Sequence, residues 1–572
     1  MRSKILTLLL GILLISSCDD ILKEKAFDFI GPEEVGNSDE AADRWVMGVY
    51  NMLSQDCYGW SIHPKFLEYD CDYNSGPDWA FAAFGAGNFQ GESNIDTMWD
   101  HPYKMIHRAN VGIYYISQMT EASEEHKNNC LGELYFLKAY SYFLLVRSFG
   151  EIPLFKKSIN EGEAIEQPRR PVSEIYEYII SLLNDAKSMA YKNTDPRYKA
   201  GRASAGAAAG LLTKVYATMA SGALPATEKI RIKGGKPLAA DNTLTLPIET
   251  TYTKIVVKGH ELFDPIAYYT LARDLAKDII DNKYGEYSLY DRFVDIWQPS
   301  SRNKREFMFA LQAKNEDQVF GNSLLLSYCG VEDANGRLTQ GQWIGGRWHW
   351  YNLFENTDQR ITEGVLHRWQ WSTVDWGSYY PNNEEWTKKS QGYVDEDGKT
   401  VPPVAPFNDG ITYITDASYL AYPTKYYYVS NRTAEKTDGL WPILRLADVY
   451  LLYAEASNEV DGPNESALFY LNEIRKRSSA TPRKIVGEGA LKEKEDFRSQ
   501  VIEERARELA FEGDRRWDLI RWGVYVNVMN AIGGADERGV VKTREEKHLL
   551  FPIPSSEIST NPYINENNPG WK

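Results

Sequence analysis

The sequence has few of the residues on which metal and thiol chemistry depend. Among 572 residues there are only 5 cysteines and 8 histidines, and no Cys-x-x-Cys pair or Cys/His ligand set occurs. The HExxH, GxSxG and GxxxxGK(S/T) motifs are also missing. This composition disfavours a metal-, thiol- or nucleotide-dependent enzyme, and we expect no cofactor.

Basic runs and long apolar runs are scarce as well. The chain carries 64 Lys and Arg against 80 Asp and Glu, a net charge of -16, which argues against nucleic acid as the main partner. The mean hydropathy is -0.47. The apolar run at residues 5–15 is too short for a bilayer, which needs ~20 residues.

The N-terminus reads as an export signal. Arg2 and Lys4 precede the apolar run, and small residues lead to Cys18. Residues 14–18 (LISSC) resemble a bacterial lipobox, in which residues 1–17 are removed, Cys18 is lipidated and residues 18–25 form a flexible tether. Removing the two cations Arg2 and Lys4 changes the net charge from -16 to -18. An ordinary signal with an incidental cysteine is the alternative.

Helical periodicity covers much of the chain. Apolar residues recur at helical spacing in residues 39–54, 131–148, 171–190, 203–220, 268–282, 443–458 and 465–477. Successive helix–turn–helix units of this kind resemble tetratricopeptide repeats, which bury a core only by stacking on one another. We therefore predict an all-α dominated fold and a single domain over residues 26–572. The small residues at 205–210 should let a neighbouring helix approach closely.

Aromatic residues are abundant, with 37 Tyr, 16 Trp and 21 Phe. Many lie in residues 58–99 and 340–439, two long segments without helical periodicity, and such segments often bind ligands. A Trp or Tyr ring can cover the apolar face of a sugar, while nearby polar groups bind its hydroxyls. The predicted ligand-binding residues are Tyr73, Asn74, Asp78, Trp79, Trp348, Trp369, Trp371, Trp376 and Tyr379. Alternatively, these rings pack the loops onto the scaffold, as we expect for Trp350.

Carboxylates in the C-terminal third could suggest hydrolysis. Glu504, Glu508 and Glu512 fall at i, i+4 and i+8 on one helix stripe, whereas a glycosidase needs two carboxylates that flank the bond. We predict instead that they form ion pairs with the interleaved arginines, including Glu512 with Arg516 at i+4. The turn at residues 395–398 (DEDG) could hold a structural calcium ion, although it lacks a complete EF-hand loop.

Several longer stretches resemble the SusD/RagB family of Bacteroidetes outer-membrane lipoproteins. They are residues 149–154 (FGEIPL), 441–456 (WPILRLADVYLLYAEA), 503–523 (EERARELAFEGDRRWDLIRWG), 550–554 (LFPIP) and 568–571 (NPGW). The resemblance implies an α-helical fold with tetratricopeptide units as scaffold and loops that form the glycan site.

The same resemblance implies a lipid-anchored, non-enzymatic receptor on the cell surface of the outer membrane. Such a receptor passes oligosaccharides, or peptides in the RagB branch, to a SusC-like TonB-dependent transporter. Asp19 and Asp20, directly after Cys18, resemble the surface-export signal of such lipoproteins. A glycan-active enzyme is the least favoured alternative.

Overall fold

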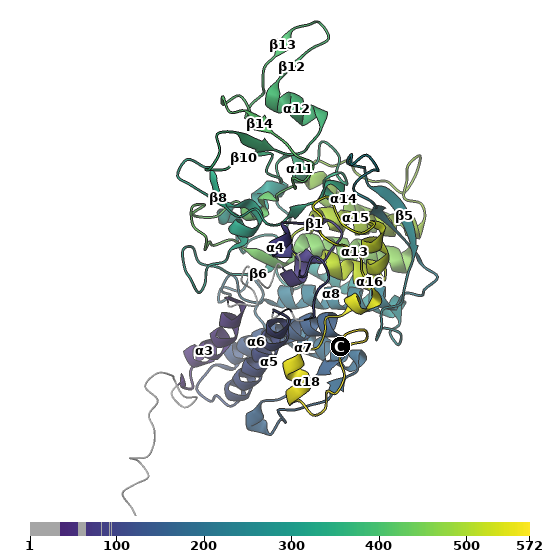
Figure 1. The fold of residues 1–572 in the computed structure, drawn as a ribbon. Coiled ribbons are helices and arrows are strands. Elements are labelled where there is room, and N and C mark those ends of the chain that lie inside the picture. The colour runs from purple at the N-terminus through teal and green to yellow at the C-terminus, as the bar shows by residue number, and fades with distance from the viewer. Residues whose placement is uncertain (1–34, 55–64, 82, 91, 93) are drawn as a thin grey trace, which may run out of the picture.

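The computed structural model describes residues 35–54, 65–81, 83–90, 92 and 94–572. Helices dominate, and the strands form only small sheets of two or three members. In Figure 1 the long helices fill the lower and central parts, and short strands with helix α12 (Glu384–Gln391) build the upper part. The all-α dominated prediction is confirmed. None of the helices in these ranges is long and apolar enough to cross a membrane.

The N-terminal half is a stack of helices that pack in chain order. They are α3 (Asp39–Tyr50), α5 (Asn94–Ser117), α6 (Glu124–Phe149), α7 (Val172–Met189), α8 (Ala205–Ala223) and α9 (Pro265–Ile280). Serine side chains at positions 38, 123 and 204 accept a backbone N–H at the start of three of them. Asp264 caps α9, and Pro265 occupies its first turn. Stacking of neighbouring helices is what tetratricopeptide pairs require. The division of these helices into tetratricopeptide pairs stays a prediction.

Helix α8 lies at the centre of this stack and is buried from Ala205 to Gly222. It packs against α7, α9 and α13 (Leu446–Asp461). The small residues of α8 do permit the close approach of a neighbouring element. We predicted a helix there, but a strand also packs closely against them. A Cβ on Gly210 would lie 2.4 Å from the Leu444 side chain, which belongs to strand β15 (Trp441–Arg445).

The C-terminal half continues the stack with α13, α14 (Glu465–Arg477), α15 (Lys494–Glu508), α16 (Arg515–Arg521) and α17 (Tyr525–Ala531). The predicted helix at 443–458 begins later, at Leu446. Residues 441–445 instead pair antiparallel with β6 (Phe307–Leu311), with register shifts on either side of Leu444. The short helix α18 (Ser555–Thr560) follows near the C-terminus.

A buried ion-pair network, here called the arginine–glutamate cluster, joins these elements. Its members are Glu306, Arg360, Arg445, Arg475, Arg477, Glu504 and Glu508. The distance from Arg475 to Glu504 is 2.6 Å, and that from Arg477 to Glu508 is 2.5 Å. All of these side chains are at most 3 % exposed. The prediction that Glu504 and Glu508 form structural ion pairs is confirmed, but their partners differ from those predicted. Of the interleaved arginines only Arg507 pairs with Glu504, at 2.9 Å, and the partners of Glu508 all come from other segments.

The prediction for Glu512 is wrong in its partner. Helix α15 ends at Glu508, and Phe511 adopts a left-handed φ of 65°, so the i,i+4 geometry is lost. Glu512 pairs with Lys425 and Arg445 instead. Arg516 pairs with Asp70, 3.0 Å away.

Two insertions decorate the scaffold. Strands β4 (Lys229–Gly234) and β5 (Ile248–Thr253) form an antiparallel hairpin, with Arg231 opposite Thr251, that lies against α15. The upper part in Figure 1 holds the hairpin of β12 (Tyr393–Val394) and β13 (Thr400–Val401). Below it lies a sheet with the order β10 (Arg368–Gln370), β11 (Gly377–Tyr379) and β14 (Tyr413–Ile414).

Candidate ligand-binding surface

The two aromatic segments meet at a short β-ladder. Strand β1 (Asn74–Ser75) pairs antiparallel with β9 (Gly345–Gly346), so that Ser75 lies opposite Gly345. Gly346 also bridges Ala421 on its other side. A Cβ on Gly346 would lie 2.3 Å from the Trp350 ring, so only glycine lets the strand lie this close to the indole. Two segments that are far apart in the sequence are thereby fixed side by side.

Immediately beyond this ladder, two tryptophans touch. Trp79 lies on the short helix α4 (Asp78–Phe81), and Trp343 lies two residues before β9. Their rings meet edge to face, with centroids 5.0 Å apart and an interplanar angle of 83°. Trp79 is 66 % exposed, and Trp343 is half-buried. Such exposure of a large indole leaves a broad apolar face free for a ligand.

Two further tryptophans lie in the turn that joins β10 to β11. Trp371 follows β10 and bridges Leu338 in strand β8 (Leu338–Gln340), the strand that leads to Trp343. Ser372 N–H donates to the Leu338 carbonyl at 2.8 Å. Trp371 is half-buried, and Trp376 is 37 % exposed at the end of the turn. We call Trp79, Trp343, Trp371 and Trp376 the aromatic surface.

Three of the predicted binding residues lie in the interior instead. Tyr73 is 3 % exposed, with its ring 6.0 Å from that of Phe511 and 6.3 Å from that of Trp350, and burial raises the pKa of its hydroxyl. The Asn74 amide donates to the backbone and carboxylate of Glu68. Trp348 is 9 % exposed and stacks on Tyr351. These side chains are packed in the interior near the ladder, so they offer a ligand little surface.

Trp369 and Tyr379 are also buried, because other aromatic rings pack against them. The Trp369 ring lies 5.6 Å from that of Tyr419 and 5.4 Å from that of Tyr422. Tyr379 packs with Phe407 and Tyr413 in a small separate core, and its hydroxyl hydrogen-bonds to Thr387 at 2.7 Å. Trp369 and Tyr379 belong to strands β10 and β11, whereas Trp371 and Trp376 lie in the turn between these strands, so one aromatic-rich segment supplies both core and surface. Of the nine predicted binding residues, these five are therefore set aside as buried, and Asp78, Trp79, Trp371 and Trp376 remain candidates for ligand contact.

Arginines near the surface are neutralised by their neighbours. Arg347 is 1 % exposed, and its Nε lies 2.8 Å from Glu537. Burial alone would raise the pKa of Glu537, but the Arg347 guanidinium lowers it below its ordinary value. Arg368 pairs with Asp409 at 2.8 Å. The exposed carboxylates of Asp78 and Asp375 adjoin Trp79 and Trp376, so the surface is suited to a neutral, hydroxyl-bearing ligand.

In the turn at residues 395–398, the first carboxylate, that of Asp395, accepts hydrogen bonds from the backbone of the turn itself. Asp395 Oδ1 accepts the backbone N–H groups of Asp397 at 3.1 Å and Lys399 at 2.8 Å. These bonds stabilise the exposed turn between β12 and β13 without an ion. Structural calcium stays an untested prediction.

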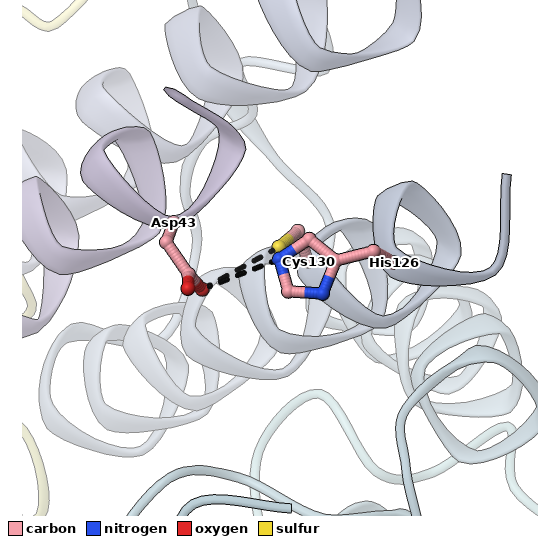
Figure 2. A group of neighbouring side chains, drawn as sticks. All are labelled: Asp43, His126 and Cys130. Carbon is pink, nitrogen blue, oxygen red and sulfur yellow. Dashed lines mark hydrogen bonds and ion pairs between the residues drawn. The ribbon is translucent and has the colours of Figure 1, made fainter. Parts of the chain in front are cut away.

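One group of possible metal ligands comes together among the described residues, namely Asp43, His126 and Cys130 (Figure 2). The Asp43 carboxylate is already paired with Arg202 at 2.6 Å and Lys199 at 2.7 Å. Burial raises the pKa of the Cys130 thiol to about 12, so the thiolate that a metal needs is disfavoured. The group therefore does not fit a metal ion.

Some predictions lie outside the described residues. They concern the signal at 1–17, the tether at 18–25 with Cys18, and the aromatic residues Tyr58 and Trp60. Trp343, in contrast, was absent from the predicted binding set although the tryptophan-rich segment contains it. Its position next to two glycines, Gly345 and Gly346, was the available signal that backbones approach closely there.

Comparison with known proteins gives consistent results. A model of the SusD family matches residues 287–571, and one described as starch-binding, associating with outer membrane, matches residues 67–217. The SusD-like protein P25 of Formosa agariphila is 23% identical over 575 residues, covering 96% of this chain and 95% of that protein.

Solved structures share the fold. The crystal structure of a SusD homolog from Bacteroides thetaiotaomicron matches with a TM-score of 0.68 and 22% identity, covering 94% of this chain and 98% of the other. A structure solved with xylogluco-oligosaccharide matches with a TM-score of 0.63 and 19% identity, covering 92% and 98%.

Proposed function

Because the chain belongs to the SusD family, we propose that it is a cell-surface glycan-binding protein of the outer membrane that captures a neutral oligosaccharide. The observation that carries this proposal is the exposed Trp79 beside Trp343, at the ladder that joins the two aromatic segments. The name of one matching family model and the ligand of one structural neighbour both point to glycans.

Binding would combine ring stacking with hydrogen bonds to hydroxyl groups. The indole of Trp79 covers the C–H face of a sugar ring, and Trp343 holds that indole at a fixed angle. Carboxylates such as Asp78 and Asp375 accept hydrogen bonds from the sugar. The proposed role includes no bond-making step, and it is supported by Glu504 and Glu508, the carboxylates that could suggest hydrolysis, being held in the arginine–glutamate cluster.

The remaining parts of the proposal concern location and partner. Lipidation of Cys18 would anchor the chain to the membrane through residues 18–25, since acyl chains insert into the bilayer. The captured oligosaccharide would then pass to a SusC-like TonB-dependent transporter. Co-purification of this transporter with the lipidated chain tests this part.

The binding claim is tested with the soluble chain, residues 19–572, by calorimetry against starch and xyloglucan oligosaccharides and against peptides. We expect one glycan class to bind without product formation and Trp79→Ala to weaken it by about tenfold or more, as loss of one aromatic contact and its buried area implies. Thermal unfolding should not change, because Trp79 is 66 % exposed.

A matched control uses a buried ring. Trp369→Ala removes an indole that is only 9 % exposed, so stability should fall more than glycan affinity. Peptide binding without glycan binding would reassign the chain to the peptide-capturing class, and turnover of any glycan would refute the receptor function.

A further inference from the structure

A second binding site is suggested by a cavity of about 760 Å³ in another part of the molecule. It lies between the end of α6, the start of α7, the loop at 255–260, helices α16 and α17, and residues 545–550 and 568–570. This volume is within the ~300–1,000 Å³ typical of small-molecule sites. Much of its wall is branched aliphatic, including Val146, Val257, Ile520, Val526, Leu549 and Leu550.

Arg147 lines this cavity and has an unusual environment. Its guanidinium carbon lies 3.9 Å from the centroid of the Phe143 ring and 5.0 Å from that of Trp517. Its Nε donates to the Phe143 carbonyl at 3.2 Å. Within the described part of the chain, no carboxylate lies within ion-pair distance of it, whereas Arg360, Arg445 and Arg521 each bind two or more. A cation on an apolar wall without a counter-ion favours an anionic ligand.

The other polar groups that line the cavity differ in whether their hydrogen-bonding groups are satisfied. Tyr176 lines the same cavity with its ring edge to face on Phe263, and the Trp517 indole N–H is buried without a hydrogen-bond partner among the described residues. The Asn568 amide is already satisfied, since it donates to the carbonyls of Phe149 and Phe551. Thr218 donates its hydroxyl to the Lys214 carbonyl at 2.7 Å.

The rim of the cavity is charged but balanced. Lys547 pairs with Glu545 at 3.1 Å, and the exposed side chains of Lys258 and Glu546 carry opposite charges. The excess positive charge is therefore at the inner wall, on Arg147. A ligand must bring an acceptor-rich anionic head to that point and an apolar body for the rest.

We propose that this cavity binds an aliphatic monocarboxylate of medium chain length, such as a fatty acid. The carboxylate would accept hydrogen bonds from Arg147 and Tyr176, as guanidinium groups match carboxylates in shape and charge. The alkyl chain would lie along the aliphatic wall, against which the hydroxyl groups of a sugar would have no hydrogen-bond partners. This site is distinct from the aromatic surface, and its existence does not depend on glycan binding.

The test titrates the soluble chain with decanoate and, separately, with decanol. Decanol has the same alkyl chain but no charge, so we expect it to bind about tenfold or more weakly, as the loss of charge-assisted hydrogen bonds implies. No saturable decanoate binding, or equal affinity for the two compounds, would overturn the proposal. This comparison needs no variant and so does not depend on any variant's folding.

Variants then locate the site. Arg147→Met should reduce decanoate affinity at least tenfold and leave decanol affinity almost unchanged, whereas Lys258→Met, which removes a cation from the rim, should change neither. Val526→Trp should block both ligands by filling the space. A cooperative thermal unfolding transition for each variant confirms that it is folded, and decanoate binding that survives in both Arg147→Met and Val526→Trp would refute the assignment.

Discussion

Replacement of Glu508 by glutamine provides a quantitative test of the arginine–glutamate cluster. Glu508 is fully buried and binds Arg477 at 2.5 Å, Arg445 at 3.1 Å and Arg360 at 3.2 Å. Burial alone would raise its pKa, but these three cations lower the pKa from 4.5 to about 2. At ~1.4 kcal/mol per pH unit, this difference corresponds to about 3 kcal/mol of stability. Breaking a buried ion pair costs a similar ~3–5 kcal/mol.

We therefore expect Glu508→Gln to lower the free energy of unfolding in urea by about 3 kcal/mol at neutral pH. The folded-state pKa is depressed, so the contribution is present above the unfolded pKa of 4.5 and is lost as the pH falls towards about 2. The difference between wild type and variant should shrink over that window.

The matched control is Glu384→Gln, at an exposed i,i+4 pair in which Glu384 lies 2.9 Å from Lys388. It should have no measurable effect, because such pairs are screened by solvent. A change below about 1 kcal/mol for Glu508→Gln, or a difference that does not depend on pH, would refute the ion-pair reasoning.

Three further changes test other parts of the structure. Trp350→Ala should lower the free energy of unfolding by ~3–5 kcal/mol in urea, because it empties a core position and removes the 2.9 Å bond from its indole to the Ala506 carbonyl. Gly346→Ala should lower both Tm and glycan affinity, since the new Cβ would be 2.3 Å from the Trp350 ring; an unchanged Tm would contradict the close approach. Burial raises the pKa of Glu68 to about 8 despite hydrogen bonds from Gly513 and Asn74. The folded state thus keeps a proton that the unfolded chain releases, and stability should fall as the pH rises from about 4.5 to 8. Thermal melts across this range should show that fall in wild type and not in Glu68→Gln.

The helical scaffold could be predicted well from the sequence, because its signals are local. Periodicity located the helix at 465–477 with the bounds that the structure has, and those at 39–54 and 171–190 to within a few residues. The error at 443–445 has a physical reason. These residues are extended because they pair with β6, a segment remote in the sequence, and local periodicity carries no information about such a partner.

The candidate site was predictable only in outline. Composition indicated two aromatic segments, but not that β1 and β9 would join them. It also could not separate Trp79, which is 66 % exposed, from Tyr73, which is 3 % exposed. The two differ in tertiary contacts alone, since Phe511 and Trp350 cover Tyr73.

The two-residue ladder between β1 and β9 has a consequence for how specificity can change. Because Trp79 and Trp343 come from different segments that this ladder joins, an insertion in either loop would turn one ring relative to the other. The helices and their ion pairs would keep their contacts, so ligand preference can diverge while the scaffold stays constant. Conversely, neither loop grafted alone onto a related scaffold would transfer the preference, and both must be moved together with their glycines.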